Sequence, residues 1–242
     1  MLFTQWLNEL TDRVLRKRSR KFARKVRKVS RNAPTSSEVL ESRVVPTITV
    51  DLSALGVLTV TGDAGANRVT ISVTGTDSYT IDGGAEGVDI GTNASATATV
   101  TDNGNSLVIG GTAGDINEII VTLGDGGDKL TVASIDDAIT DADGGDDSGD
   151  TIQGPNVAMT AWTIDEAGAG NSVGVGTQVV SFSGFRIAQG GTEADTFTIS
   201  SASTLQLKGG LGDNSFNLGA ALTGSISGED GVDILTGNKS IT

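Results

Sequence analysis

The sequence predicts an all-β protein, a parallel β-solenoid of the β-roll or β-helix type, preceded by a basic amphipathic N-terminal helix. Short runs of alternating β-branched residues fill the chain after residue 46, and clusters of Gly, Asp and Asn separate these runs. A helical pattern of apolar residues occurs only near the N-terminus. These observations define three segments: a basic helix at 1–33, a polar linker at 34–46 and a Gly/Asp-rich body at 47–242.

Composition excludes several classes of enzyme. The 242 residues include no Cys and no His, so the chain lacks the means for a Ser-His-Asp triad, a Cys nucleophile, a Cys/His zinc site or a haem ligand pair. Aromatic residues make up only 4%, which favours a thin core repeated many times over one thick globular core. We therefore expect a protein that is not an enzyme.

Charge is distributed very unevenly along the chain. Residues 1–46 carry 12 of the 17 Lys and Arg against four acids, a net charge of +8, whereas residues 47–242 carry five bases against 26 acids, a net charge of −21. An excess of this size repels itself and nucleic acid alike, and bound cations would neutralise part of it. The two parts are expected to have different functions.

The N-terminal segment has one apolar and one basic face. Phe3, Leu7, Leu10 and Val14 recur at three- or four-residue steps, and no acid interrupts the bases between positions 13 and 31. The pattern favours an export segment or a helix on a membrane surface; nucleic-acid contact and a merely solvated helix stay as alternatives. No apolar run has the length of about 7–15 residues that a standard secretory signal requires, and no transmembrane helix is predicted.

The linker ends in Leu40-Glu41-Ser42-Arg43. This tetrapeptide resembles the Leu-Glu-x-Arg motif that follows a basic stretch in many exported surface proteins of planctomycetes. The resemblance implies a bacterial protein that is secreted or displayed at the cell surface.

The sequence of the body predicts short strands that are separated by turns at regular intervals. Period-two runs of about four to six residues predict strands, for example at 48–50, 58–60, 69–73, 119–121, 130–132, 196–199 and 205–207. Gly190–Thr198 and Gly209–Asn217 each keep four of the five defining positions of the nonapeptide G-G-x-G-x-D-x-U-x. Weaker copies end at Asn67-Arg68-Val69, Asp128-Lys129-Leu130, Asp150-Thr151-Ile152 and Asp233-Ile234-Leu235.

The marked positions Asp195, Asn214 and Asp233 follow one another at intervals of 19 residues. A spacing near 20 is typical of one coil of a parallel β-solenoid, and it predicts about nine or ten coils in the body. In such coils Gly permits the turn, Asp offers a carboxylate there, and the apolar position points inward.

These repeats resemble the RTX or haemolysin-type calcium-binding repeats. Trp162-Thr163-Ile164, Phe182-Ser183-Gly184-Phe185 and Gly190 through Phe197 are also similar to repeat units of very large bacterial surface adhesins. The resemblance implies export, calcium binding and a structural or adhesive role. It also implies partners at the cell surface, such as a polysaccharide, or self-association through solenoid ends.

Calcium prefers six to eight oxygen ligands, so the turn acids are the candidate ligands. The densest group lies at 136–150, where the alternative is a solvated, disordered acidic loop or a hinge in the body. The other candidates lie in turns where Asp and Gly are also ordinary turn formers. The predicted metal ligands are Asp125, Asp128, Asp143, Asp146, Asp147, Asp150, Asp195, Asp213, Asn214, Asp230 and Asp233.

Three further questions stay open from the sequence. Trp162, Phe182 and Phe185 could stack on a sugar, although a core position is the commoner role. A β-helix polysaccharide lyase or hydrolase is an alternative function, against which the bases of the body, Arg68, Lys129, Arg186, Lys208 and Lys239, stand far apart in the sequence. The chain could also be a truncated piece of a longer repeat protein, without binding activity of its own.

Overall fold

The body is built from β-strands and turns. A computed structural model describes residues 48–242 except residues 86, 95–97, 103, 112–115, 137–138, 146, 158 and 169. All described residues lie in one unit, Val44–Thr242. Among them there is no helix, and hence none long and apolar enough to span a bilayer. The predicted N-terminal helix and most of the linker lie outside the described residues.

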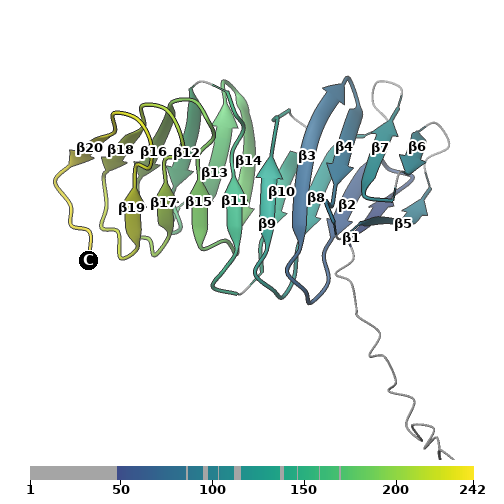
Figure 1. Ribbon diagram of the computed structural model, residues 1–242, viewed down its shortest axis with the longest axis horizontal. Helices are drawn as coiled ribbons and strands as arrows, with labels where there is room; N and C mark the ends of the chain where they lie inside the picture. The colour runs from purple at the N-terminus through teal and green to yellow at the C-terminus, as the bar shows by residue number, and fades with distance from the viewer. Residues whose placement is uncertain are drawn as a thin grey trace, which may run out of the picture. The chain divides into compact units, whose positions relative to one another are not determined.

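Twenty strands form two sheets (Figure 1). The eleven-stranded sheet contains β1 (Ile48–Leu52), β2 (Val57–Thr61), β5 (Val88–Asn93), β8 (Glu118–Thr122), β10 (Ile139–Asp143), β12 (Thr160–Ile164), β13 (Asn171–Val175), β14 (Gln178–Ser183), β16 (Asp195–Ile199), β18 (Ser215–Leu218) and β20 (Ile234–Gly237). The nine-stranded sheet contains β3 (Arg68–Gly75), β4 (Ser78–Asp82), β6 (Thr99–Asp102), β7 (Ser106–Gly110), β9 (Lys129–Val132), β11 (Thr151–Gln153), β15 (Ile187–Gln189), β17 (Gln206–Lys208) and β19 (Ser225–Ser227).

The all-β prediction is confirmed, but both sheets mix parallel and antiparallel pairs. Antiparallel hairpins join β3 to β4 and β13 to β14. Each hairpin has a two-residue turn with a positive φ, 48° at Asp77 and 64° at Gly176, which suits the twist of paired strands. The sequence reading missed these hairpins because it treated every turn as the corner of a parallel coil.

From β15 to β20 the chain alternates regularly between the two sheets. In the eleven-stranded sheet Phe197 pairs with Phe216 and Phe216 with Leu235. In the nine-stranded sheet Ala188 pairs with Leu207 and Leu207 with Ile226. Each of these steps equals the interval of 19 residues between Asp195 and Asn214. The predicted spacing is therefore the register of these strands.

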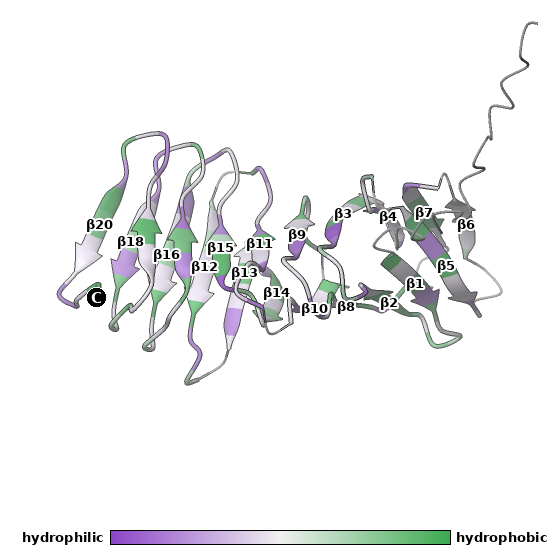
Figure 2. Ribbon diagram, turned by 60° about the horizontal axis from the view of Figure 1, so that its bottom comes forward, coloured by the Kyte–Doolittle hydropathy of each residue, from purple (hydrophilic) through white to green (hydrophobic). Residues whose placement is uncertain are grey.

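One hydrophobic core runs between the sheets. Side chains alternate in and out along each strand, so that β16, for example, buries Asp195, Phe197 and Ile199 and exposes the two threonines between them. Trp162, Phe197 and Phe216 stack in a column, with ring centroids 5.4 Å and 4.9 Å apart. The apolar bands (green) that cross β16, β18 and β20 in Figure 2 continue this column.

The acidic segment at 136–150 contains a strand. β10 pairs in parallel with β8 on one side and with β14 on the other, and its Ala142 is fully buried. The next strand, β11, lies between β9 and β15 in the other sheet. Both sheets therefore pass this segment without an interruption of their strand order.

Candidate functional site

Six Asn and Asp side chains stack at two corners of the body. Asn67, Asp128 and Asp150, here called the first ladder, stand immediately before β3, β9 and β11 of the nine-stranded sheet. The second ladder consists of Asp195, which begins β16, and of Asn214 and Asp233, which precede β18 and β20 in the other sheet. Parallel pairing of these strands brings each ladder residue over the next.

In each ladder a side-chain oxygen accepts a hydrogen bond from the backbone N–H of the ladder residue that precedes it in the sequence. Oδ1 of Asp128 accepts from Asn67 at 2.7 Å, and Oδ1 of Asp150 accepts from Asp128 at 2.8 Å. The second ladder repeats the contact: Oδ1 of Asn214 accepts from Asp195 and Oδ1 of Asp233 from Asn214, both at 2.9 Å. The partners are separated by 61, 22, 19 and 19 residues, so one interaction ties together segments far apart in the chain.

The ladder side chains form hydrogen bonds with backbone groups at the corners, where the chain leaves the regular sheet. Asp195 also accepts the N–H of Gly191 in its own turn at 2.8 Å, and the amide of Asn214 donates to the carbonyl of Gly212 at 3.1 Å. Asp and Asn carry two polar atoms on a short side chain, so one residue can bond to its own turn and to the neighbouring strand at the same time. Because Asn67, Asp128, Asp150, Asp195 and Asn214 are at most 2% exposed, these contacts are shielded from water.

Burial perturbs the carboxylates of both ladders. Burial raises the pKa of Asp195 to about 6, against the opposing effects of the Gly191 N–H, the Trp162 indole and the Thr160 hydroxyl. The indole Nε1 and Oδ1 of Asp195 are both buried and do not meet in hydrogen-bond geometry, so the indole compensates for burial only in part. Burial also raises the pKa of Asp150. The N–H of Asp128 lowers this pKa, the charge of Asp147 raises it, and the N–H of Asp147 and the charge of Arg186 lower it.

Asp195 should therefore make stability depend on pH. Its pKa is higher in the folded than in the unfolded chain, so its contribution is fully present below about pH 4 and is lost as pH rises through about 6. We expect Asp195→Asn to remove this dependence, which is on the order of 2 kcal/mol, and to equal or exceed the wild type in stability at pH 7.5. Denaturant unfolding at several pH values between 4 and 8 measures the effect.

Asp230→Asn is the matched control, because it removes the same charge from an exposed turn. This variant should keep the pH dependence of the wild type. Equal slopes in Asp195→Asn and the wild type would contradict the assignment of the dependence to Asp195.

The structure divides the eleven predicted metal ligands into three groups. Asp128, Asp150, Asp195 and Asn214 are buried ladder residues, and Asp233 is a half-buried one. Asp125, Asp143, Asp147, Asp213 and Asp230 are half-exposed or exposed in turns and at the end of β10. Asp146 lies outside the described residues.

The surroundings of these residues differ in their fit to calcium. Around Asp195 the neighbours are a backbone N–H, an indole N–H and a hydroxyl, which are donors and do not fit a cation. At the stacked turns before β9 and β11, the N–H groups of Asp128 and Asp147 also face Asp150. These turns still fit a cation better than Asp195 does, because the charge of Asp147 repels Asp150 and Oδ2 of Asp150 is buried without a hydrogen bond among the described residues. Since no three described acids converge there, main-chain carbonyls and water would supply the remaining ligands.

Asn67 is a ladder residue that the sequence analysis left out of the candidate site. It is fully buried, and its Oδ1 accepts the N–H of Asp63 at 3.0 Å within its own turn. The alignment of Asn67-Arg68-Val69 with Asp128-Lys129-Leu130 was the available signal. The sequence analysis took Asn214 as a candidate from the same kind of position but not Asn67.

The aromatic residues considered as sugar platforms belong mainly to the core. Trp162 is 1% exposed, and Phe182 and Phe185 are each 4% exposed. The two phenylalanines also line a pocket of about 260 Å³, together with Glu166, Gly170, Asn171, Ser183, Gly184 and Arg186. Their exposed area is too small for a sugar to stack on them, so the core role is the one the structure supports.

Compared with known protein families, curated proteins and solved structures, the chain matches none.

Proposed function

We propose that the chain is an exported or cell-surface, calcium-binding repeat protein with a structural or adhesive role, and that its body is a parallel β-solenoid. The observation that carries this proposal is the 19-residue register shared by both sheets from β15 to β20. In a repeat of this kind each added coil contacts only its neighbours, so the protein can be lengthened while the arrangement of each coil stays the same. Such an architecture suits a spacer or an adhesive module.

The ladders support a mechanical role. Each rung couples two coils through a hydrogen bond, which is buried between Asp195 and Asn214 and half-buried between Asn214 and Asp233. The aromatic column couples the coils of Phe197 and Phe216 through apolar contact. A buried hydrogen bond whose acceptor is charged contributes roughly 1.5–3 kcal/mol. Successive coils therefore resist separation more strongly than the sheet hydrogen bonds alone would allow.

Calcium is proposed at the stacked turns Asp125–Asp128 and Asp147–Asp150. The ion would be held by Asp147 and Asp150, and it would offset both the burial that raises the pKa of Asp150 and the smaller effect of the Asp147 charge. With a net charge of −21 on residues 47–242, the body is expected to be less stable during export, where calcium is scarce, than outside the cell. The basic segment before residue 33 is proposed to direct that export.

A calcium titration of the full-length protein tests the proposal. For a site with a dissociation constant of about 1 mM, 10 mM calcium should add about 1.4 kcal/mol to the free energy of unfolding. Thermal and denaturant unfolding would be followed by circular dichroism in chelator and at calcium concentrations up to 10 mM. Unchanged curves would rule out calcium stabilisation.

Two controls separate a site from general screening. Magnesium at equal concentration screens charge equally but suits this ligand set less well, so it should stabilise less than calcium does. Asp147→Asn should abolish most of the calcium response, whereas Asp213→Asn, in an exposed turn before β18, should preserve it. Equal responses in the two variants would argue against the assigned turn.

A further inference from the structure

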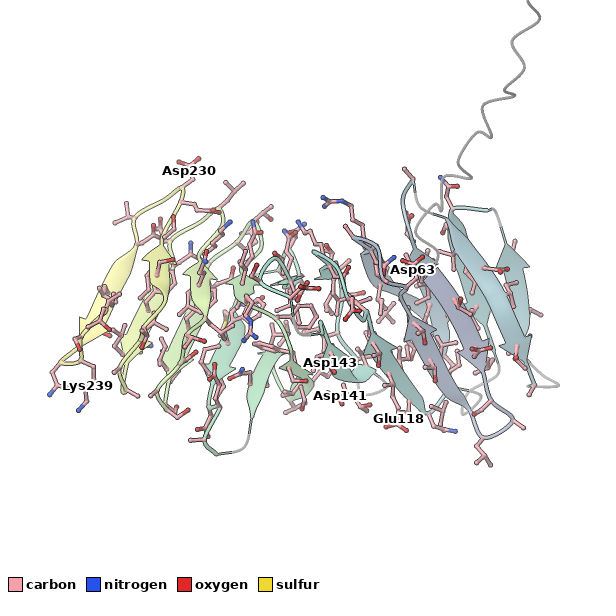
Figure 3. The ribbon with its side chains drawn as sticks, turned by 90° about the horizontal axis from the view of Figure 1, so that it is seen from below. Asp63, Glu118, Asp141, Asp143, Asp230 and Lys239 are labelled. Carbon is pink, nitrogen blue, oxygen red and sulfur yellow. The ribbon has the colours of Figure 1, made fainter. Side chains whose placement is uncertain are left out.

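The two sheets carry different charges. The strands of the eleven-stranded sheet contain six acids and no Lys or Arg. The strands of the nine-stranded sheet contain Arg68, Lys129 and Lys208, with only two acids, Asp82 and Asp102, in β4 and β6 toward one edge. Glu118, Asp141 and Asp143 of the eleven-stranded sheet lie along one side of the body in Figure 3.

The three bases share one surface, here called the basic face. Their neighbours Val69, Leu130 and Leu207 are buried, so alternation along each strand turns the bases outward. The surface is therefore the outer side of the nine-stranded sheet. Of the two remaining bases of the body, Arg186 directly precedes β15 of the same sheet.

Arg68 and Lys129 are directly side by side. They are register partners in the parallel pair of β3 and β9, and like charges in this position are destabilising. Burial lowers the pKa of Lys129, and the charges of Arg68 and Lys208 lower it further. In a body with only five bases, two of them therefore lie side by side, and such a concentration of positive charge favours the approach of an anion.

Mainly uncharged polar side chains lie between the bases. Lys129 and Lys208 are separated by three interstrand steps, about 14 Å across the strands, and by two residues, about 7 Å, along them. Of the four half-exposed side chains that point outward between them, Thr151, Gln153 and Gln189 are polar and Ile187 is apolar. Hydroxyls and amides of this kind both donate and accept hydrogen bonds, as the hydroxyls of a sugar do.

We propose that the basic face binds an extended, carboxylated polysaccharide. Its carboxylates pair with Arg68, Lys129 and Lys208, and its hydroxyls form hydrogen bonds with the Thr and Gln side chains between these bases. This inference rests on the proposed adhesive role and names the partner for it. The wide separation of Lys129 from Lys208 suits a chain whose anionic groups are separated by neutral sugar hydroxyls.

Nucleic acid suits this surface less well. Duplex DNA carries one charge per about 1.7 Å of its axis, and the many acids elsewhere on the body would repel it. The outward positions of β9, β11, β15 and β17 also include no aromatic residue on which a base could stack. Charge spacing and side-chain chemistry therefore favour the polysaccharide.

Binding of the full-length protein to immobilised hyaluronate tests the inference. Hyaluronate is carboxylated, and its carboxyl-reduced form is the neutral control. Lys129→Gln and Lys208→Gln should each weaken binding about threefold to fivefold, as expected for the loss of one ion pair that is not fully exposed. Lys239→Gln removes the one base of the body that lies outside this sheet, after β20, and should change the affinity less than about 1.5-fold.

Several outcomes would overturn the inference. The N-terminal basic segment is present in every variant, so differences among the variants report on the body alone. Equal losses in Lys129→Gln and Lys239→Gln, retained binding to the carboxyl-reduced polymer, or matching losses on duplex DNA would each contradict it. A loss of the polysaccharide proposal does not affect the proposed calcium-binding function, because the calcium titration tests that function separately. The unfolding midpoint of Lys129→Gln should be no lower than that of the wild type, because the substitution relieves a like-charge contact.

Discussion

Replacing Phe197 by alanine is expected to lower the free energy of unfolding by about 3–5 kcal/mol. The ring of Phe197 is fully buried, and it lies between Trp162, at an interplanar angle of 7°, and Phe216, at 13°. Truncation would leave a cavity between two aromatic rings that strand pairing holds in place. Denaturant unfolding followed by circular dichroism measures the loss.

Leu235→Ala is the matched control for this prediction. Leu235 is the next residue of the same column, but it is 55% exposed. Its truncation removes fewer contacts and should cost about 1 kcal/mol or less. If the two variants lost equal stability, the column would not be the continuous core that the structure shows.

Gly210→Ala is expected to destabilise the protein by roughly 3 kcal/mol or more. Gly210 has a φ of +86°, and an added Cβ would collide with the carbonyls of Gly190 and Gly191, which lie 20 and 19 positions earlier in the chain. The collision involves backbone atoms of two stacked turns, so neither side relaxes easily. Thermal and denaturant unfolding of the purified variant measure the loss.

Gly170→Ala distinguishes the cost of the collision from the cost of the backbone strain. Gly170 has a similar φ of +92°, but an added Cβ there meets no atom within 4 Å. It should therefore cost only the backbone strain, about 1–2 kcal/mol. The difference between the two variants measures how closely the coils approach, and similar losses would mean that they are not in contact at Gly210.

The sequence predicted the repeating part of the fold well because its signal is local. Each of Asp195, Asn214 and Asp233 begins or directly precedes a strand, and their interval of 19 residues is the register of those strands. Alternating apolar residues then determine which side chains point inward. The mixed pairing of the two sheets was missed, although runs 69–73 and 78–82 lie close enough together to signal a hairpin.

The nine or ten coils expected from residue count did not allow for insertions. Arg68 and Lys129 are adjacent in space but distant in the chain, because β4 to β8 intervene between β3 and β9. The same insertion separates the hydrogen-bonded Asn67 and Asp128 by 61 positions in the sequence. Arg68 and Lys129, which stand far apart in the sequence, are therefore neighbours in the structure. Long-range pairing depends on which strands meet, and sequence separation does not record that.

The chemistry of the turn acids was also only partly predictable. Their pattern indicated carboxylates at corners, which the structure bears out for Asp128, Asp150 and Asp195. Whether such a carboxylate accepts N–H groups or holds an ion depends on its neighbours in the next coil. At Asp195 these include Asn214, 19 residues away, and the indole of Trp162.

The register of successive coils is tested most directly by disulfide formation, because the chain contains no cysteine. Thr196 and Ser215 are register partners on the outer side of adjacent parallel strands, within the Cα separation of about 4.4–6.8 Å that a disulfide requires. The double variant Thr196→Cys and Ser215→Cys should therefore oxidise to an intramolecular disulfide. The pair Thr196→Cys and Ser225→Cys, with residues in different sheets, should stay reduced. Failure of the first pair to form, or equal oxidation of both, would contradict the regular stacking of coils on which the proposals rest.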